Sequence, residues 1–410
     1  MIVVAEILVD LRAGKMLTTD LQEGLFVASV NLGIILMLPL GAYLADHYGR
    51  LRTVILGESI VFTASLSQMA CTSAMSLTAA RICVGFGMAL CILLKPLYIS
   101  ELAETKHRGK IMTLFSLAFT TGILIVALLG IAIPAKDRNW RLFLGMGAIP
   151  ALMLLLAAQF YLVESPVWLE MSQRRRRSEG EEEEEDDEAE TRVSLTTGTE
   201  RRSRQKCGQI FGELFTQEDT AQSTWIAVLL GLLYEFDGIW MLILYRSDIF
   251  SQAVGEKDVH VYVFVMCLVL LLANIVPGLL IDRVGRRKLL WSGFAVSMLA
   301  KILVGTLFFF GVQGLSLGLI LMVWAGAAQC GVSVVSTVVI SEIFDSRHRS
   351  VGMCFVYWFM LTVGFGMSLI FKGSEVTMGY GGWMFVFTVA SGLVVVPLYR
   401  GMPETMSNVI

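Results

Sequence analysis

The chain has 410 residues, of which 55% are hydrophobic and only 16% are charged, and its formal net charge is −3. A soluble domain with so little charge would expose large apolar patches and aggregate, so this composition excludes an ordinary soluble enzyme and indicates a membrane protein. The basic residues lie in short groups between apolar runs and form no continuous face, which argues against a nucleic-acid-binding protein.

Apolar segments long enough to cross a membrane follow one another along the chain. A helix needs roughly 20 residues to span the hydrocarbon core. Eleven segments meet that length, at about residues 24–45, 54–74, 77–99, 111–133, 141–162, 222–245, 260–281, 289–311, 315–340, 351–371 and 382–399. The expected fold class is therefore an all-α membrane protein.

The first residues differ from these segments. Ile2 to Leu11 is apolar but short, and Glu6 and Asp10 interrupt it. It lacks the charged start and the long apolar core of a signal peptide. We expect residues 1–23 to be an external, amphipathic N-terminal segment, on the side of the membrane opposite the cytoplasm.

Lys and Arg gather in alternate loops, which sets the expected orientation. The basic loops contain Arg50 with Arg52, Lys106 to Lys110, Arg174 to Arg177, Arg283 to Lys288, and Arg347 with Arg349. Because cytoplasmic loops carry the excess of Lys and Arg, these loops and the C-terminal tail are predicted to be cytoplasmic. The pattern leaves open whether the protein sits in the plasma membrane or an organelle membrane.

One long polar segment, residues 171–221, divides the chain. Arg174 to Arg177 is followed by the acidic run Glu181 to Asp187. Dense blocks of like charge stay solvated, so the segment is predicted to be a disordered cytoplasmic linker. The alternative is a regulatory or lipid-binding tract that uses the four arginines. The linker separates an N-terminal half, residues 24–170 with five helices, from a C-terminal half, residues 222–410 with six.

The two halves repeat the same landmarks. Asp46 and Asp282 lie 236 residues apart, and Glu101 and Glu342 lie 241 apart. Arg108 and Arg349 also lie 241 apart, and Glu164 and Glu404 lie 240 apart. Landmarks at nearly one offset indicate an internally duplicated membrane protein.

Charged residues at the helix ends suggest a latch at the cytoplasmic rim. An Asp at a helix end, a Gly that allows a tight turn and a following Arg occur at 46–50 and again at 282–286. Ion pairs between such groups strengthen where water is excluded and loosen when a bundle opens. The alternative is a simple positive-inside bias. The predicted latch residues are Asp46, Arg50, Glu101, Arg108, Glu164, Asp282, Arg286, Arg287, Glu342, Arg349 and Glu404.

Together with ESPVWL at 164–169 and MPET at 402–405, these motifs resemble those of the sugar porters of the major facilitator superfamily. The resemblance covers the chain from about residue 24. It implies a transporter and not an enzyme, with twelve helices in two halves around a central site that opens alternately to each side. It implies no cofactor. Against that template the first helix is missing, so about eleven of twelve helices are expected and a truncated gene product is considered.

The resemblance also places the solute pocket. Positions that hold amides or a Trp in hexose carriers correspond here to Ser116, Tyr234, Glu235, Trp240 and Thr337, so the pocket diverges from the sugar-binding pattern. The residues that match or could replace the proton-coupling groups of the family are Arg81, Glu235 and Asp237. Positions two apart point about 200° apart on a helix, so only one of the two acids can face the cavity. The resemblance favours Glu235, which stands where the family has a Gln. The alternative for Glu235 is an internal ion pair or a protonated, hydrogen-bonded side chain.

Several other residues carry weaker expectations. Lys95 is expected to extend to the membrane interface, Glu58 to join the rim charges, and Lys301 receives no role. The Cys residues are expected to be small buried hydrophobes, and no metal site is predicted.

These patterns predict a secondary carrier of a small polar organic solute, sugar-like by the resemblance. One alternative is an organic-ion carrier that uses Glu235 with Tyr234 and Trp240 as aromatic walls. Another is a degenerate homologue that acts as a sensor or is inactive. The expected partners are the solute, the lipid bilayer and, for a symporter, protons. The oligomeric state stays open.

Overall fold

The computed structural model describes residues 20–102, 108–133, 139–173, 211–256, 259–344 and 348–401. Within these ranges the secondary structure is helical, without a strand. The helices are α2 (Asp20–Tyr48), α3 (Arg50–Ala70), α4 (Ala74–Leu102), α5 (Arg108–Ala132), α6 (Trp140–Gly145), α7 (Ala148–Phe160), α10 (Glu218–Phe236), α11 (Ile239–Leu244), α12 (Arg246–Val254), α13 (Val259–Val284), α14 (Arg286–Phe309), α15 (Leu315–Ala327), the π-helix η2 (Ala328–Ser333), α16 (Val334–Glu342) and α17 (Arg349–Gly401).

Nine helices in the described part are long and apolar enough to cross a membrane. The predicted segment 111–133 appears as α5, whose apolar portion Ser116–Ala132 is shorter. The 53 residues of α17 include two of the nine spans, Val351–Ser374 and Thr377–Gly401, and Gly379 between them has a non-helical backbone. Helices suit a membrane because they satisfy every backbone polar group internally.

The prediction of one continuous helix over 222–245 is wrong. The helix stops at Phe236 and resumes as α11 at Ile239. Gly238 lies between them in the left-handed region, with φ of 80°, which an α-helix cannot accommodate. A Cβ at Gly238 would also stand 2.7 Å from the ring of Phe387, so both the backbone and the packing require glycine there.

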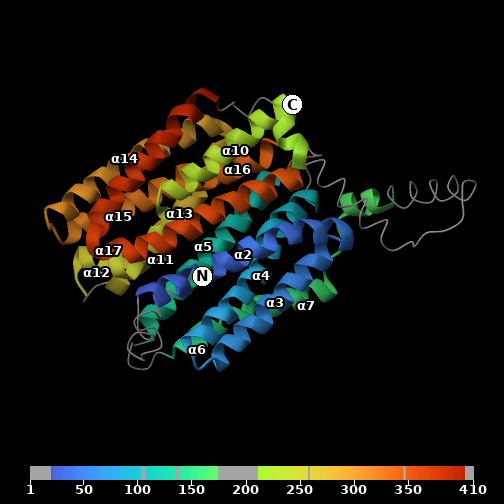
Figure 1. Ribbon diagram of the computed structural model, residues 1–410, viewed down its shortest axis with the longest axis horizontal. Helices are drawn as coiled ribbons and strands as arrows, with labels where there is room; N and C mark the ends of the chain where they lie inside the picture. Colours follow the sequence, from blue (N-terminus) through green and yellow to red (C-terminus); the bar gives the residue numbers. More distant parts are fainter. Residues whose placement is uncertain are drawn as a thin grey trace, which may run out of the picture.

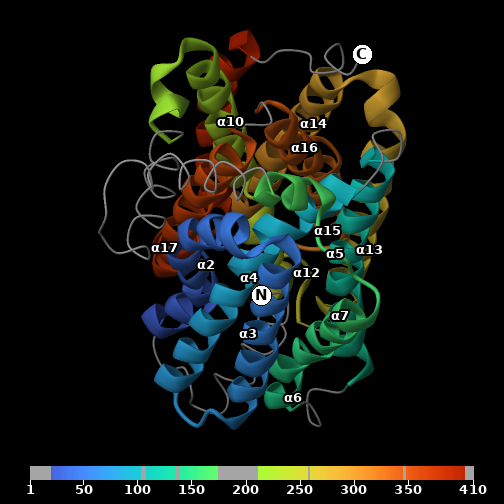
Figure 2. The same cartoon turned by 90° about the vertical axis from the view of Figure 1, so that its right-hand side faces the viewer.

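The helices form two groups, which confirms the predicted two-half bundle. In Figure 1, α2 to α7 (blue to green) lie together on one side and α10 to α17 (yellow-green to red) on the other. Figure 2 shows the same separation from the right-hand side. The groups meet where α2 packs against α17 and where α5 packs against α13. We call this contact between the halves the seam.

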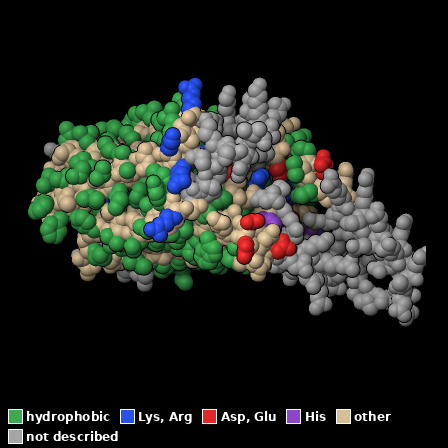
Figure 3. Space-filling model, turned by 90° about the horizontal axis from the view of Figure 1, so that it is seen from above, with side chains coloured by type: hydrophobic (Ala, Val, Ile, Leu, Met, Phe, Trp, Pro, Cys, Tyr) green, Lys and Arg blue, Asp and Glu red, His purple; other side chains and the backbone are tan. Residues whose placement is uncertain are grey.

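The outer faces of the helices are apolar, as lipid contact requires. Large side chains such as Phe309 and Leu393 are 80% and 69% exposed. Figure 3 shows apolar side chains over most of the left-hand part of this face, with Lys and Arg side chains near the middle and Asp, Glu and His side chains farther to the right. A soluble protein rarely exposes a continuous apolar surface of this extent, so the protein is an integral membrane protein with several spans.

Small residues allow the helices to approach closely. A Cβ built on Gly33 of α2 would collide with the backbone carbonyl of Ile82 in α4, and one on Gly85 would collide with the carbonyl of Val30. Gly293 of α14 and Gly331 of η2 form a similar contact, with a Cβ 2.5 Å from the opposite Cα. Close backbone approach of this kind is the usual way in which helices pack in membranes.

Replacing Gly33 by Ala is therefore expected to lower the unfolding free energy by about 1–2 kcal/mol, because a backbone atom cannot move aside as a flexible side chain can. The matched control is Gly122→Ala on α5, where a Cβ meets nothing within 4 Å. That change should leave stability equal or slightly higher, since Ala favours a helix. Thermal unfolding of the purified protein in detergent measures both, and equal midpoints would contradict the packing argument.

Candidate functional site

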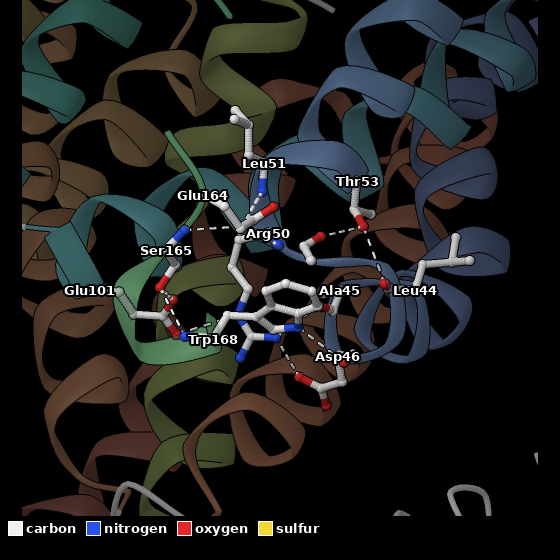
Figure 4. A network of polar contacts seen from close by, with 11 residues as sticks. Leu44, Ala45, Asp46, Arg50, Leu51, Thr53, Glu101, Glu164, Ser165 and Trp168 are labelled. Carbon is white, nitrogen blue, oxygen red and sulfur yellow. Dashed lines mark hydrogen bonds and ion pairs between the residues drawn. The ribbon is translucent and has the colours of Figure 1, made fainter. Parts of the chain in front are cut away.

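Arg50 is the centre of a polar cluster at one end of the N-terminal half (Figure 4). Its guanidinium is almost fully buried and donates to Asp46 Oδ1 at 2.7 Å and to the carbonyl of Ala45 at 2.8 Å. The Nε atom donates to Glu101 Oε1 at 3.4 Å. Asp46, Arg50, Glu101 and Glu164 are called the N-half rim cluster below.

The side chain of Glu164 caps the N-terminus of α3, whose own N-cap residue, Gly49, makes no side-chain hydrogen bond. Its Oε1 atom accepts backbone N–H bonds from Arg50 at 2.9 Å and from Leu51 at 3.0 Å, the first residues of that helix. Gly49, which precedes α3, has φ of 107°, and its own Cβ position lies 2.5 Å from Glu164 Oε2. Only glycine fits there. A carboxylate at a helix N-terminus also complements the helix dipole.

The segment that follows Glu164 closes the cluster. Ser165 Oγ donates to Glu101 Oε2 at 2.5 Å, and the indole N–H of Trp168 donates to the carbonyl of Asp46 at 3.1 Å. All these residues belong to the N-terminal half. The cluster therefore clamps α2, α3, α4 and the segment after α7 to one another within that half, and its contacts do not cross the seam.

The C-terminal half repeats part of this arrangement. Gly285, with φ of 92°, precedes Arg286 at the start of α14. Arg286 Nη2 lies 3.3 Å from Glu342 Oε1 of α16, and Arg287 Nη2 donates to the carbonyl of Tyr399 at 2.8 Å. Arg349 begins α17. The side chains of Arg108 and Asp282, and all of Glu404, lie outside the described residues.

A buried polar network crosses the seam near the middle of α13. Asn274 Nδ2 donates to Thr120 Oγ1 at 3.0 Å, and Asn274 Oδ1 accepts from Ser116 Oγ at 3.1 Å. Both partners are on α5, in the other half. Gln329 Nε2 of η2 donates to the same Oδ1 atom at 3.1 Å. Asn274, Thr120 and Gln329 are buried and Ser116 is partly buried. These four residues are called the seam network.

Sequence reasoning found Ser116 but missed the other three members of the seam network. Each is a single neutral polar residue within a strongly apolar run, and no motif or periodicity distinguishes it. A usable signal was the cost of an amide at membrane depth, which favours an interior position with partners. The π-helix around Gln329 is a second signal, visible only in the structure, since such bulges occur often at functional sites.

The aromatic pocket candidates also lie near the seam. The ring of Trp240 in α11 packs edge-on against Phe119 of α5, with ring centroids 6.3 Å apart. Tyr234 packs partly buried against a core that includes residues of α2 and α17. Thr337 is not joined to them by a hydrogen bond; its hydroxyl donates within its own helix, to the carbonyl of Val334 at 2.8 Å.

The two acids near the break in the predicted span 222–245 point to different neighbours. Glu235 is 1% exposed, and neither carboxylate oxygen has a hydrogen-bond partner. Asp237 is fully buried and pairs with Lys301 Nζ of α14 at 2.9 Å, while Ser297 Oγ donates to the same Asp237 oxygen at 2.6 Å. Lys301, which had no role from sequence, is thus the partner of Asp237.

Arg81 and Lys95 are both turned toward protein. Arg81 is buried, donates from Nε to the carbonyl of Phe26 at 3.0 Å and lies over the ring of that residue at 4.4 Å. Lys95 forms an ion pair with Glu58 of α3, and Cys91 donates to the same carboxylate at 3.2 Å. The Lys95 side chain is still 30% exposed, so its extension to the membrane interface stays a prediction.

A second charged group crosses the seam at the opposite end from the rim clusters. Lys372 Nζ of α17 lies 3.9 Å from Glu23 Oε2 of α2 and 3.6 Å from Asp248 Oδ2 of α12. Lys372 and Glu23 are largely buried. Lys372, Glu23 and Asp248 are called the outer cluster. Among the described residues, no group of three or more His, Cys, Asp or Glu could hold a metal ion.

Comparisons with known proteins agree with this architecture. The chain is 27% identical to the arabinose-proton symporter of Escherichia coli over 357 residues, which cover 82% of this chain and 72% of that one. It is 28% identical to the probable metabolite transport protein CsbC of Bacillus subtilis, with 94% of this chain and 84% of the relative covered. These relatives are transport proteins by their names.

Solved structures show the same fold. The proton:xylose symporter XylE, bound to 6-bromo-6-deoxy-D-glucose, superposes with a TM-score of 0.77 at 19% identity, covering 98% of this chain and 93% of XylE. The human organic anion transporter MFSD10 superposes with a TM-score of 0.65 at 16% identity, covering 96% of this chain and 87% of MFSD10.

The family model "Sugar (and other) transporter" matches residues 7–409. The chain therefore belongs to the sugar (and other) transporter family of the major facilitator superfamily.

Proposed function

We propose that the protein carries a small hydroxylated solute, of the sugar class, across a membrane by alternating access, and that the seam network is part of its binding site. The observation that carries this proposal is a pair of hydrogen bonds across the seam, in which Asn274 accepts from Ser116 and donates to Thr120. Secondary carriers bind their solute near the bilayer midplane between the two halves.

The chemistry of the seam network suits a sugar. Its two carboxamides and two hydroxyls offer donors and acceptors without net charge, and a sugar hydroxyl both donates and accepts. A solute that enters the seam would replace the bonds between Asn274 and α5 with bonds of its own, so few buried polar groups would lose a partner. Trp240 and Phe119 would add an apolar wall for the ring of the solute.

Alternating access assigns the charged clusters to the two sides. The excess of Lys and Arg around the rim clusters supports a cytoplasmic position for them, for the linker 171–221 and for the C-terminus. The outer cluster then joins the halves on the opposite side. In this proposal the halves 24–170 and 222–410 rock about the seam, and the ion pair between Lys372 and Glu23 closes the outer side.

An organic-ion carrier is the less favoured alternative. Its charge-recognising residue would be Glu235, which is only 1% exposed in this conformation. The likeness to an organic anion transporter shows the fold alone. An inactive homologue is less favoured as well. An inactive protein could join its two halves by apolar contacts alone, whereas a buried amide that is hydrogen-bonded to hydroxyls of the other half suits a binding site.

Asn274→Ala is expected to reduce sugar uptake by roughly 10- to 100-fold in kcat/KM, because one lost hydrogen bond to a buried polar group costs about 1–3 kcal/mol. The assay is uptake of radiolabelled L-arabinose, D-xylose, D-glucose and myo-inositol into liposomes that contain the purified protein. Wild-type transport of none of these, or full transport by the variant, would contradict the proposed site.

Adjacent threonines supply a matched control. Thr120 contacts Asn274 across the seam, whereas Thr121 is exposed and bonds only to the carbonyl of Leu117 in its own helix. Thr120→Val should reduce uptake and Thr121→Val should not. Equal loss in both variants would indicate general damage to α5 and would remove the support for a seam site.

A further inference from the structure

Glu235 is an acid without a partner inside the bundle. It lies one residue before the end of α10 and in the middle of the predicted span 222–245. Its side chain is 1% exposed and neither oxygen accepts a hydrogen bond. An ionised carboxylate is strongly disfavoured in such a place, so the group is neutral in this conformation and carries a proton.

The groups around Glu235 do not supply a charge that could replace the proton. The elements packed against α10 include α11, α16, α17 and η2. The titratable side chain that interacts with Glu235 is Tyr234 on α10 itself, and Tyr357 of α17 and Ser333 of η2 lie beside Tyr234. None of these hydroxyls carries a positive charge.

The charged groups of the neighbouring elements do not pair with Glu235. Asp237, two residues after Glu235, is turned to Lys301 on α14. The described charged side chains of α16 and α17 lie at helix ends or in the outer cluster, and none forms an ion pair with Glu235: Glu342, Arg349, Lys372 and Arg400. Helix α11 has no charged residue.

The carboxyl group of Glu235 packs closely against α17. A Cβ on Gly364 of α17 would stand 2.6 Å from Glu235 Oε2 and 3.0 Å from its Cδ. The carboxyl group of Glu235 therefore occupies the space that a side chain at position 364 would fill. An organic cation would need room that the packed helices do not provide, so the ligand of smallest size, H⁺, is the one this geometry accepts.

The break in the helix gives the acid a route to water. Gly238 separates α10 from α11 three residues after Glu235, and helix breaks are where lids and hinges bend. We infer that Glu235 is the proton-carrying residue of the transport cycle, an inference that rests on the proposed function. When α11 moves at the break, the carboxyl meets water and its O–H proton passes to water as H₃O⁺. The carboxylate must regain a proton before it is buried again.

The first experiment measures proton movement. Liposomes that contain the wild-type protein and an internal pH-sensitive dye are given a gradient of each of the four sugars named above. Wild type should acidify or alkalinise the lumen as sugar moves. Glu235→Gln should lose this proton movement while sugar exchange between loaded and unlabelled pools continues. Glu170→Gln, an exposed carboxyl after Glu164, is the matched control and should behave as wild type.

The second experiment does not depend on transport. The infrared difference spectrum between wild type and Glu235→Gln at neutral pH should contain the C=O stretch of a protonated carboxylic acid. Gly364→Ala should shift that band, because the Cβ displaces the carboxyl group. Absence of the band overturns the inference whatever the uptake assay shows. Sugar transport without proton movement overturns it too and leaves the proposed function standing. If no sugar is transported while the band is present, the proposed function fails, and with it the transport role of Glu235, and only the protonated carboxyl group remains.

Discussion

Lys301→Met is expected to lower the unfolding free energy by about 3–5 kcal/mol, because it leaves the carboxylate of Asp237 buried without its cation. Both side chains are 0% exposed, and Lys301 Nζ lies 2.9 Å from Asp237 Oδ1. Lys301 Nζ also donates to Ser391 Oγ of α17 at 3.2 Å. Unfolding of the purified protein in detergent, followed by tryptophan fluorescence, measures the change.

Two further variants separate the ion pair from the size of the side chain. Lys288→Met, at an exposed position on the same helix, should change stability little. The double variant Asp237→Leu with Lys301→Met should recover most of the loss, since two apolar residues replace a buried pair at little net cost. A single Lys301 variant as stable as the Lys288 variant would show that the pair contributes nothing.

The ion pair fixes the place where the chain leaves α10. Asp237 is the C-cap residue of α10 and directly precedes Gly238. Through Lys301 and Ser391 the break is held to α14 and α17. Glu235, on the other side of the helix, is free of such bonds. One acid therefore anchors the break, and the neighbouring one remains available for a proton.

The rim clusters could be anticipated from sequence because their residues stand at helix ends. The ends of the apolar runs mark the ends of the helices. A charged residue at the end of one helix must therefore lie near the charged residues at the ends of neighbouring helices. The structure does bring Asp46, Arg50, Glu101 and Glu164 together. That Glu164 caps α3 through backbone N–H groups was not predicted, because a cap from 114 residues away has no local signal.

The interior contacts could not be anticipated in the same way. The pairing of Asp237 with Lys301 and of Asn274 with Thr120 depends on how each helix is rotated about its axis, and a helix that is apolar on all sides gives no such information. The break at Asp237–Gly238 did have a signal, since Asp-Gly favours a turn, but the apolar run around it outweighed that signal.

The contacts divide into two kinds with different consequences for transport. Those of the rim clusters, Arg50 with Glu101 and Arg286 with Glu342, each stay within one half. The contacts of Asn274 and Lys372 cross the seam. Rocking of the halves would break or rearrange the contacts that cross the seam and could leave the contacts within each half intact. If the halves rock as proposed, the rim clusters would keep each half rigid during the movement and would not act as a lock between the halves.

Glu164→Ala is accordingly expected to lower the unfolding free energy by about 2–3 kcal/mol, since a helix cap and hydrogen bonds to a charged acceptor are lost together. Glu164 Oε1 accepts from the backbone of Arg50, Leu51 and Ser165, all at 2.9–3.0 Å. Glu164→Gln keeps an acceptor oxygen in the same place and should therefore lower the unfolding free energy by less than Glu164→Ala does. Thermal unfolding in detergent compares the two.

Hydrogen exchange shows where the loss acts. In Glu164→Ala the amides of the first turn of α3 should exchange faster, because Arg50 N and Leu51 N no longer have an acceptor. Glu170→Ala, with an exposed side chain, is the control and should leave both stability and exchange unchanged. If exchange instead rises across the seam at Asn274 while α3 stays protected, Glu164 acts between the halves and the view of the rim cluster as a clamp within one half is wrong.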